Sequence, residues 1–337
     1  MEYASEQEVE LAVPHIRALQ KSMNGVLFGQ SELIDLVITG LLARGHILLE
    51  GLPGLGKTEL VKGLSKTLGL DTKRVQFTPD LLPGDITGNP VLQETDGKRS
   101  FVFQPGPLFT NLVLADEINR ASPKTQSALL EAMQERCVTV LGVTHALPAP
   151  FFVLATQNPI ELEGTYPLPE AQLDRFLFKL EVMRNSAATL EQIVMMRELG
   201  EEPAVEATMN AEEFDQVINL VRKIYLPDVV ANYIARLVTA THPGESESAK
   251  FIKFGSSPRA ALSLASAAKA RALMNERPNA SFEDVKWVAP SVLRHRVLLD
   301  YNAQVEGITV NQVIDQVIAE VPFQDQSTPK TLKSATA

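Results

Sequence analysis

A glycine-rich stretch that ends in lysine and threonine carries the strongest chemical signal in the sequence. It matches the pattern G-x-x-x-x-G-K-[ST] at every fixed position, and it runs through Gly51, Leu52, Pro53, Gly54, Leu55, Gly56, Lys57 and Thr58. An apolar, strand-like run precedes it, and a helical pattern begins at Glu59. Glycines let successive backbone N–H groups point into one concavity, where the positive end of the helix dipole adds to them. The stretch predicts a phosphate-binding loop, with Lys57 along the β- and γ-phosphates and Thr58 as a Mg²⁺ ligand.

Two acidic residues and an amide lie at the ends of two other apolar runs. Asp116 and Glu117 follow the run 112–115, and Asn158 comes shortly after the run 151–155. Asp116 would hold the Mg²⁺ shell, Glu117 would orient and polarise the attacking water, and Asn158 could hold the same water. On the residues alone, the acidic pair could instead cap the following turn, and an asparagine before proline is more often a turn former. The position at strand ends favours a hydrolytic site.

The elements that must position these groups alternate between strand and helix through the first half of the chain. This alternation predicts an α/β fold with a doubly wound, mostly parallel sheet and the ligand at the carboxyl ends of its strands. Leading helices are expected over 6–20 and 31–44, and hairpin inserts over 91–103 and 137–147, the first with an Asp96-Gly97 turn. The expected strands are 46–49, 73–77, 112–115, 151–155 and 177–182.

After Arg184 the strand patterns give way to helical ones. We therefore expect a nucleotide-binding core with its N-terminal helix over 1–184, an all-α domain over 185–323 and a disordered tail over 324–337. Residues such as Ser281 and Thr309 supply helix-start signals. The expected helices of the second domain are 187–199, 210–224, 228–241, 258–275, 281–298 and 309–319.

Composition argues against several classes of protein. Lys and Arg number 31 against 41 Asp and Glu, so the net charge of −10 makes nucleic acid a poor partner. The single cysteine, Cys137, rules out an internal disulfide, and the five histidines share no metal-ligand spacing. No apolar run is long enough for a membrane span, and the first residues do not resemble a signal peptide, so a cytoplasmic protein is expected.

The motifs together resemble the MoxR family of AAA+ ATPases over roughly residues 20–300. The most specific signatures are A-D-E-I-N-R-A at 115–121 and Y-P-L-P-E-A-Q-L-D-R-F at 166–176. The resemblance implies an AAA+ core with two hairpin inserts and a helical lid. It also implies that Asn158 is the sensor 1 residue, Arg175 the arginine finger and Arg259 the sensor 2 arginine. By the same likeness the segment that contains Phe28, Gly29 and Gln30 packs on the adenine, while the glycine-rich loop, Glu59 and Asp116 contact ATP and Mg²⁺.

The two arginines can also be weighed from their surroundings. Arg175 lies between apolar residues just before a buried strand, where a charge needs an anion, either a phosphate or a carboxylate such as Asp174. Arg259 lies in the first turn of a helix and could either contact the γ-phosphate, of its own or a neighbouring subunit, or be solvated there. Arg120 could reach across a subunit interface, or it could face solvent.

These observations predict a Mg²⁺-dependent ATPase that assembles into a homo-oligomeric ring, most often a hexamer, and hydrolyses ATP at subunit interfaces. The resemblance implies a chaperone-like role in remodelling or maturing a protein client, commonly with a partner that carries a von Willebrand factor A domain. Two alternatives stay open at this point. One is a DNA-translocating or helicase-type motor, and the other is a nucleotide-gated scaffold with little hydrolysis.

Overall fold

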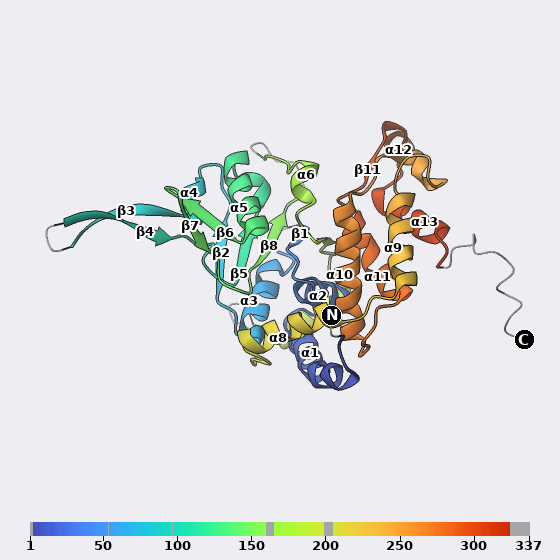
Figure 1. The fold of residues 1–337 in the computed structure, drawn as a ribbon, viewed down its shortest axis with the longest axis horizontal. Helices are drawn as coiled ribbons and strands as arrows, with labels where there is room; N and C mark the ends of the chain where they lie inside the picture. The colour runs from blue at the N-terminus through green and yellow to red at the C-terminus, as the bar shows by residue number, and fades with distance from the viewer. Residues whose placement is uncertain (1–2, 53, 96–97, 160–164, 199–204, 324–337) are drawn as a thin grey trace, which may run out of the picture. The chain divides into compact units, whose positions relative to one another are not determined.

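The computed structural model describes residues 3–52, 54–95, 98–159, 165–198 and 205–323. They fall into two compact units (Figure 1). One unit runs from Ser5 to Arg222, and the other begins at Lys223 and includes Tyr3 and Ala4. The change of sequence pattern at Arg184 comes before this division, and the predicted domain boundary there stays a prediction. The tail predicted to be disordered lies outside the described residues.

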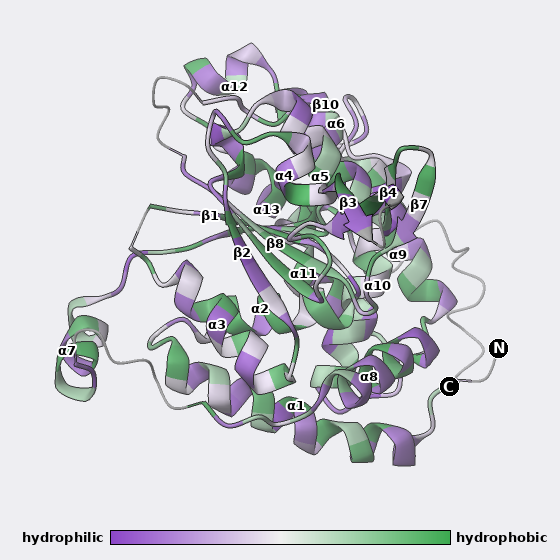
Figure 2. Ribbon diagram, turned by 90° about the vertical axis from the view of Figure 1, so that its left-hand side faces the viewer, coloured by the Kyte–Doolittle hydropathy of each residue, from purple (hydrophilic) through white to green (hydrophobic). Residues whose placement is uncertain are grey.

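A five-stranded parallel sheet with the order β2-β5-β8-β1-β9 forms the centre of the first unit. The inner strands β5 and β8 are buried along almost their whole length because neighbouring strands flank them and helices cover both faces. Figure 2 shows the edge strand β2 in hydrophilic colours, in contrast to the hydrophobic β8 further into the sheet. The strands are β1 (Ile47–Glu50), β2 (Thr72–Gln76), β5 (Leu112–Asp116), β8 (Phe152–Gln157) and β9 (Phe178–Glu181).

The first helix is longer than predicted. It continues through Asn24 and Gly25 to Val26 because its last turn packs closely on α3. A Cβ added to Gly63 of α3 would lie 3.1 Å from Met23 Cε and from Val26 Cγ1, so the absent side chain lets the two helices approach. The helical elements of this unit are α1 (Glu6–Val26), α2 (Ser31–Leu42), α3 (Lys57–Leu68), α4 (Pro83–Thr87), η1 (Ile118–Arg120), α5 (Pro123–Glu135), α6 (Glu170–Leu173), α7 (Ala187–Met196) and α8 (Ala211–Lys223).

Both predicted hairpins are present. The first consists of β3 (Gly88–Thr95) and β4 (Lys98–Pro105) and projects from the rest of the unit (Figure 1), while its predicted Asp96-Gly97 turn lies outside the described residues. The second consists of β6 (Cys137–Val140) and β7 (Val143–Ala146). The rings of Phe103 and His145 stack with centroids 4.0 Å apart and join the bases of the two hairpins. The hairpins are therefore connected by a direct aromatic contact.

The second unit is mainly helical. Capping boxes at Ser281 and Thr309 begin two of its helices, as predicted. The predicted helix 281–298 is too long, because α11 ends at Leu293 and Leu298 instead pairs with Phe254 in a two-stranded antiparallel sheet. The elements are α9 (Asp228–Ala240), η2 (Ser248–Phe251), β10 (Ile252–Phe254), α10 (Pro258–Met274), α11 (Phe282–Leu293), β11 (Leu298–Leu299), α12 (Tyr301–Val305) and α13 (Val310–Glu320). Within the described ranges, no helix combines the length and apolarity needed to cross a bilayer.

A buried histidine, His46, connects the start of β1 to β8 and α5 by hydrogen bonds. The backbone N–H of Val153 in β8 donates to Nδ1 of His46 at 3.0 Å, so the ring proton lies on Nε2, which donates to the Met133 carbonyl oxygen at 3.1 Å. Burial lowers the pKa of His46 from an ordinary value near 6.5 to about 4, against the raising effect of the Met133 carbonyl. The folded protein therefore holds this ring neutral in the range where an unfolded chain would protonate it.

The protein should lose stability as the pH falls from about 6.5 to about 4, because below 6.5 the unfolded state binds a proton that the folded state excludes. One pKa unit corresponds to about 1.4 kcal/mol, so the full effect on the unfolding free energy is about 3 kcal/mol. Urea unfolding of the wild type and of His46→Asn at several pH values would measure it. Equal pH slopes for the two proteins would contradict this assignment.

Candidate nucleotide site

The glycine-rich loop connects β1 to α3 at the carboxyl end of the sheet. Gly54 and Gly56 have φ values of 80° and 83°, in the left-handed region that favours glycine, and Gly56 is the N-cap of α3. Lys57 Nζ donates to the Gly51 carbonyl oxygen at 2.7 Å. Burial lowers the pKa of the Lys57 ammonium, and the charges of Asp116 and Glu117 raise it. The loop thus presents a helix N-terminus and a cation at one point.

The two predicted carboxylates lie opposite this loop and are held by different partners. Asp116 is the last residue of β5, and its Oδ2 accepts from Arg74 Nη2 at 2.7 Å. Glu117 has a left-handed backbone, with φ 55° and ψ 52°, and its Oε2 accepts from Gln76 Nε2 at 2.8 Å and Arg120 Nη1 at 2.7 Å. The strained residue therefore turns its carboxylate away from the strand direction and toward β2.

One threonine fixes both carboxylate residues. The Thr156 hydroxyl donates to Asp116 Oδ1 at 2.5 Å, and it accepts from the backbone N–H of Glu117 at 2.8 Å. The Thr156 side chain is fully buried in β8, so water does not compete for either hydrogen bond. Thr156 is not part of any recognised motif, although its place near the end of the strand beside β5 is a usable signal.

Replacing Thr156 by valine should lower ATP turnover by about tenfold or more, because both hydrogen bonds are lost at constant side-chain volume. Thr156→Ser keeps the hydroxyl and is the matched control, which should retain most of the turnover. Steady-state phosphate release, measured together with nucleotide affinity, separates the two variants. The bridging role would be refuted by a valine variant as active as the serine variant.

Two residues of the edge strand β2 were also missed. Arg74 and Gln76 are two residues apart, so both side chains lie on the same face of the strand, and Gln76 is in register with Asp116. Arg74 Nη2 also donates to Gln76 Oε1 at 3.0 Å and links the two carboxylate contacts. The polar residues on both sides of the single apolar residue of this strand, Val75, are the sequence signal that could have identified them.

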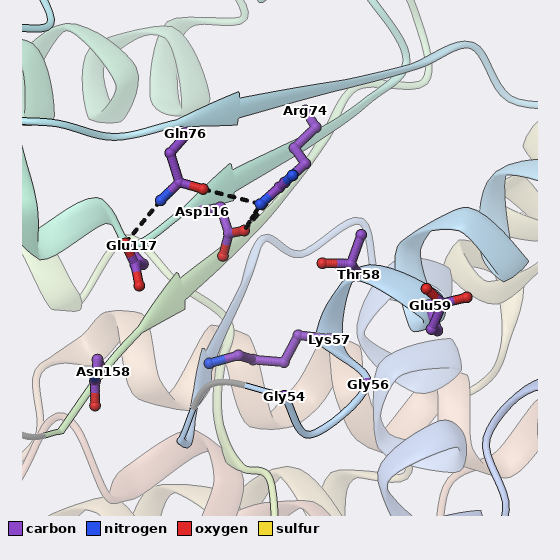
Figure 3. A pocket seen from close by; sticks show the side chains of 10 residues that line it. All are labelled: Gly54, Gly56, Lys57, Thr58, Glu59, Arg74, Gln76, Asp116, Glu117 and Asn158. Atoms are coloured by element: carbon purple, nitrogen blue, oxygen red, sulfur yellow. Dashed lines mark hydrogen bonds and ion pairs between the residues drawn. The ribbon is translucent and has the colours of Figure 1, made fainter. Parts of the chain in front are cut away.

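The loop and the carboxylates enclose a cavity of about 460 Å³. In Figure 3 the Thr58 hydroxyl is turned toward the strand that carries Asp116, and Glu59 lies on the side of Thr58 away from that strand. A hydroxyl and a carboxylate are the oxygen ligands that Mg²⁺ prefers, so these residues fit the ion. The lining residues are Gly54, Gly56, Lys57, Thr58, Glu59, Arg74, Gln76, Asp116, Glu117 and Asn158.

The remaining predicted residues of the site lie within the loop or at the end of β8. The Gly51 N–H donates to the Gln157 carbonyl oxygen at 3.2 Å, and the Leu55 side chain lies against Gly51, whereas Pro53 lies outside the described residues. Asn158 directly follows β8 and lines the cavity, as expected for a residue that would hold a water there.

The segment predicted to pack on the adenine is held by residues around α7. The Arg197 guanidinium lies 5.2 Å from the centroid of the Phe28 ring, and Gln30 Nε2 donates to Asn185 Oδ1 at 3.2 Å. Gly29 has a φ of 69°, and an added Cβ would lie 2.5 Å from Thr189 Oγ1. The close approach of α7 therefore requires glycine at this position.

The two predicted arginines lie in different units. Arg175 occupies the turn between α6 and β9, and its guanidinium makes no hydrogen bond or ion pair with any other residue that the structure describes. Its neighbour Asp174 is thus not its partner. Arg259 is exposed in the first turn of α10, in the second unit. Arg120, left open above, is paired with Glu117.

Comparisons with known proteins identify the family. Residues 46–178 match the family model described as "ATPase family associated with various cellular activities (AAA)", and residues 244–317 match the AAA lid domain. Chaperone MoxR1 of Mycobacterium tuberculosis is 39% identical over 93% of this chain and 85% of its own length. Protein MoxR of Paracoccus denitrificans is 31% identical over 91% of this chain and 95% of its own length.

A solved structure extends the likeness to the whole fold. A candidate ATPase from Cytophaga hutchinsonii is 40% identical to this chain and superposes with a TM-score of 0.87, covering 95% of this chain and 98% of its own. The parallel sheet, the hairpin inserts and the helical lid fit that likeness. Because the identity extends over nearly the full length of several relatives, the chain belongs to the MoxR family of AAA+ ATPases.

Proposed function

We propose that this ATPase requires Mg²⁺, assembles into a ring and acts as a chaperone-like remodeller or maturation factor for a protein client. The observation that carries the hydrolytic part is the fixed pair Asp116 and Glu117, which Thr156 holds across the cavity from the phosphate loop. A scaffold that only binds nucleotide would not need a second, separately positioned carboxylate.

Each cavity residue then has a definite role. The loop amides and Lys57 bind the phosphates, and Thr58 with Asp116 would hold Mg²⁺. When bound, the metal supplies positive charge that neutralises the transferring phosphoryl group. Glu117 orients the attacking water and draws on its proton, while Asn158 holds that water from the end of β8. Gln76 and Arg120 set the direction of the Glu117 carboxylate.

Hydrolysis in this proposal is completed by a neighbouring subunit. The Arg175 guanidinium has no partner among the described residues of its own chain, and a free guanidinium beside a buried strand favours an anion supplied from outside. A homo-oligomeric ring, which we expect to be a hexamer, would bring Arg175 to the nucleotide of the next subunit. Arg259 would report nucleotide state from the lid.

The hairpins are the proposed contact with the client. Leu92 and Phe101 form a cross-strand pair on the first hairpin and are 53% and 69% exposed, and Leu141 and Val143 are exposed on the second. Apolar side chains on a projecting hairpin suit an apolar polypeptide segment better than a phosphate backbone. One relative is named a chaperone, which supports a client protein. The family resemblance alone implies a partner with a von Willebrand factor A domain.

The test is capture of the client by Glu117→Gln, which should stay in the ATP-bound state. Pull-downs with ATP should retain a specific protein that is lost with ADP, and the double variant Glu117→Gln with Phe101→Ser should lose it as well. In a separate assay, the wild-type protein is tested for stimulation of its ATPase activity by DNA at fixed salt. Stimulation by DNA without ATP-dependent protein capture would overturn the proposed function in favour of a DNA motor.

A further inference from the structure

Arg74 contacts the carboxylate of Asp116 with two of its donors. Its Nη2 lies 2.7 Å and its Nε lies 3.2 Å from the same oxygen, Oδ2. The contact joins neighbouring strands, because β2 and β5 pair in parallel and Arg74 is in register with Leu114, two residues before Asp116. The guanidinium thus forms an ion pair with the residue to which the proposed function assigns Mg²⁺.

The two oxygens of the Asp116 carboxylate have different partners. Oδ1 accepts from the hydroxyl of Thr156, which is buried and is not among the described residues that line the cavity. Oδ2 accepts from Arg74, which does line the cavity, and Figure 3 shows this contact across the space from the phosphate loop. Arg74 therefore occupies the oxygen whose partner belongs to the cavity.

The Asp116 carboxylate keeps its orientation without Arg74. The Thr156 hydroxyl holds Oδ1 from inside the sheet, and the Asp116 side chain is only 14% exposed. The Arg74 side chain is 54% exposed, so water can solvate the guanidinium when it leaves the carboxylate. An ion pair with one exposed partner is weak. Arg74 is therefore a replaceable partner of Asp116, and Thr156 is the fixed one.

A divalent cation and Arg74 would use the same negative charge. The two N–H donors of Arg74 take up both lone pairs of Asp116 Oδ2. A guanidinium and a metal ion at one oxygen also repel each other. The loop already places a cation close by, because the charges of Asp116 and Glu117 raise the pKa of the Lys57 ammonium. Little negative charge is left for a metal while Arg74 stays in contact.

We propose that Arg74 competes with Mg²⁺ for the Asp116 carboxylate and thereby sets the metal affinity of the site. This inference rests on the proposed assignment of Mg²⁺ to Thr58 and Asp116. Arg74 leaves Oδ2 when the metal binds, and its Nη2, which also donates to Gln76 Oε1 at 3.0 Å, keeps a partner on its own strand. The opposite role, in which Arg74 orients Asp116 as a metal ligand, predicts the opposite change in metal affinity.

The test measures how much Mg²⁺ strengthens ADP binding to the full-length protein. A fluorescent ADP analogue is titrated at constant ionic strength, once in EDTA and once in saturating Mg²⁺. The dissociation constant in EDTA divided by that in Mg²⁺ is the magnesium ratio, from which a general loss of nucleotide affinity cancels. Arg74→Met removes the competing charge and keeps an unbranched stem, so it should raise the magnesium ratio by about three- to fivefold.

Lys73→Met is the matched control on the same strand. Lys73 is exposed, its side chain lies on the opposite face of β2 from Arg74, and it is not among the described residues that line the cavity. The same charge is removed, and the magnesium ratio should stay at the wild-type value. An equal rise in Lys73→Met and Arg74→Met would overturn the proposal. So would an unchanged or lower ratio in Arg74→Met, and a lower ratio would assign Arg74 the orienting role.

A double-mutant cycle shows whether the effect acts through Asp116. Asp116→Asn should lower the magnesium ratio, and adding Arg74→Met to it should produce no further change. A rise of the same size with and without Asp116→Asn would refute competition for this carboxylate. If Asp116→Asn leaves the ratio at the wild-type value, the proposed metal site is itself wrong and the competition with it. If Asp116→Asn lowers the ratio and Arg74→Met does not raise it, the metal site stands and only the competition is refuted.

Discussion

Glu117→Gln should bind ATP as tightly as the wild type while its turnover falls by about 10²- to 10⁴-fold, the range expected when a general base is lost. Glutamine has nearly the same shape, so the contacts with Gln76 and Arg120 are altered only in charge and donor pattern. Fluorescent-nucleotide titration and steady-state phosphate release measure the two quantities separately. Undiminished phosphate release would refute the role assigned to Glu117.

A matched control is available on the neighbouring helix. Glu131 lies exposed on α5 and is not among the residues that line the cavity, so Glu131→Gln changes the same charge without touching the site. Its turnover should equal that of the wild type. A comparable loss in both variants would show that the net charge of this region, rather than the Glu117 carboxylate, limits hydrolysis.

The sheet could be predicted because its inner strands are recognisable from their own sequences. The runs that became β5 and β8 are continuously apolar, and such runs form central parallel strands wherever both faces are covered. The end of α1 could not be predicted, because Asn24-Gly25 is locally a stop signal. The contact of Met23 with Gly63, distant in sequence, overrides it.

The site was predictable to the extent that its residues belong to compact motifs. The loop and the Asp116-Glu117 pair are contiguous in sequence, so spacing alone identifies them. Thr156 and Arg74 act through side-chain contacts with Asp116 across strand pairs, and their residue types are common at such positions. Only the pairing order β2-β5-β8 brings them together, and the local sequence does not determine the order of the strands.

Arg175→Ala should retain ATP binding and lose assembly-dependent hydrolysis by about 10³-fold or more, the effect expected when an arginine finger is removed. No intramolecular contact of the guanidinium with another described residue is broken, so the unfolding temperature should stay close to that of the wild type. Turnover as a function of protein concentration measures the assembly-dependent part. A large fall in thermal stability would instead indicate a structural role.

Mixing two inactive variants distinguishes action within one subunit from action between subunits. A subunit with Arg175→Ala still carries Glu117, and a subunit with Glu117→Gln still carries Arg175. If Arg175 acts on the neighbour's nucleotide, roughly a quarter of the interfaces in an equal, random mixture regain both groups, because ring interfaces join different surfaces. Turnover would then reappear on mixing. If Arg175 acts within its own chain, every site in the mixture lacks one group and no activity returns. Recovery on mixing therefore requires that each working site draw its Glu117 and its Arg175 from different subunits.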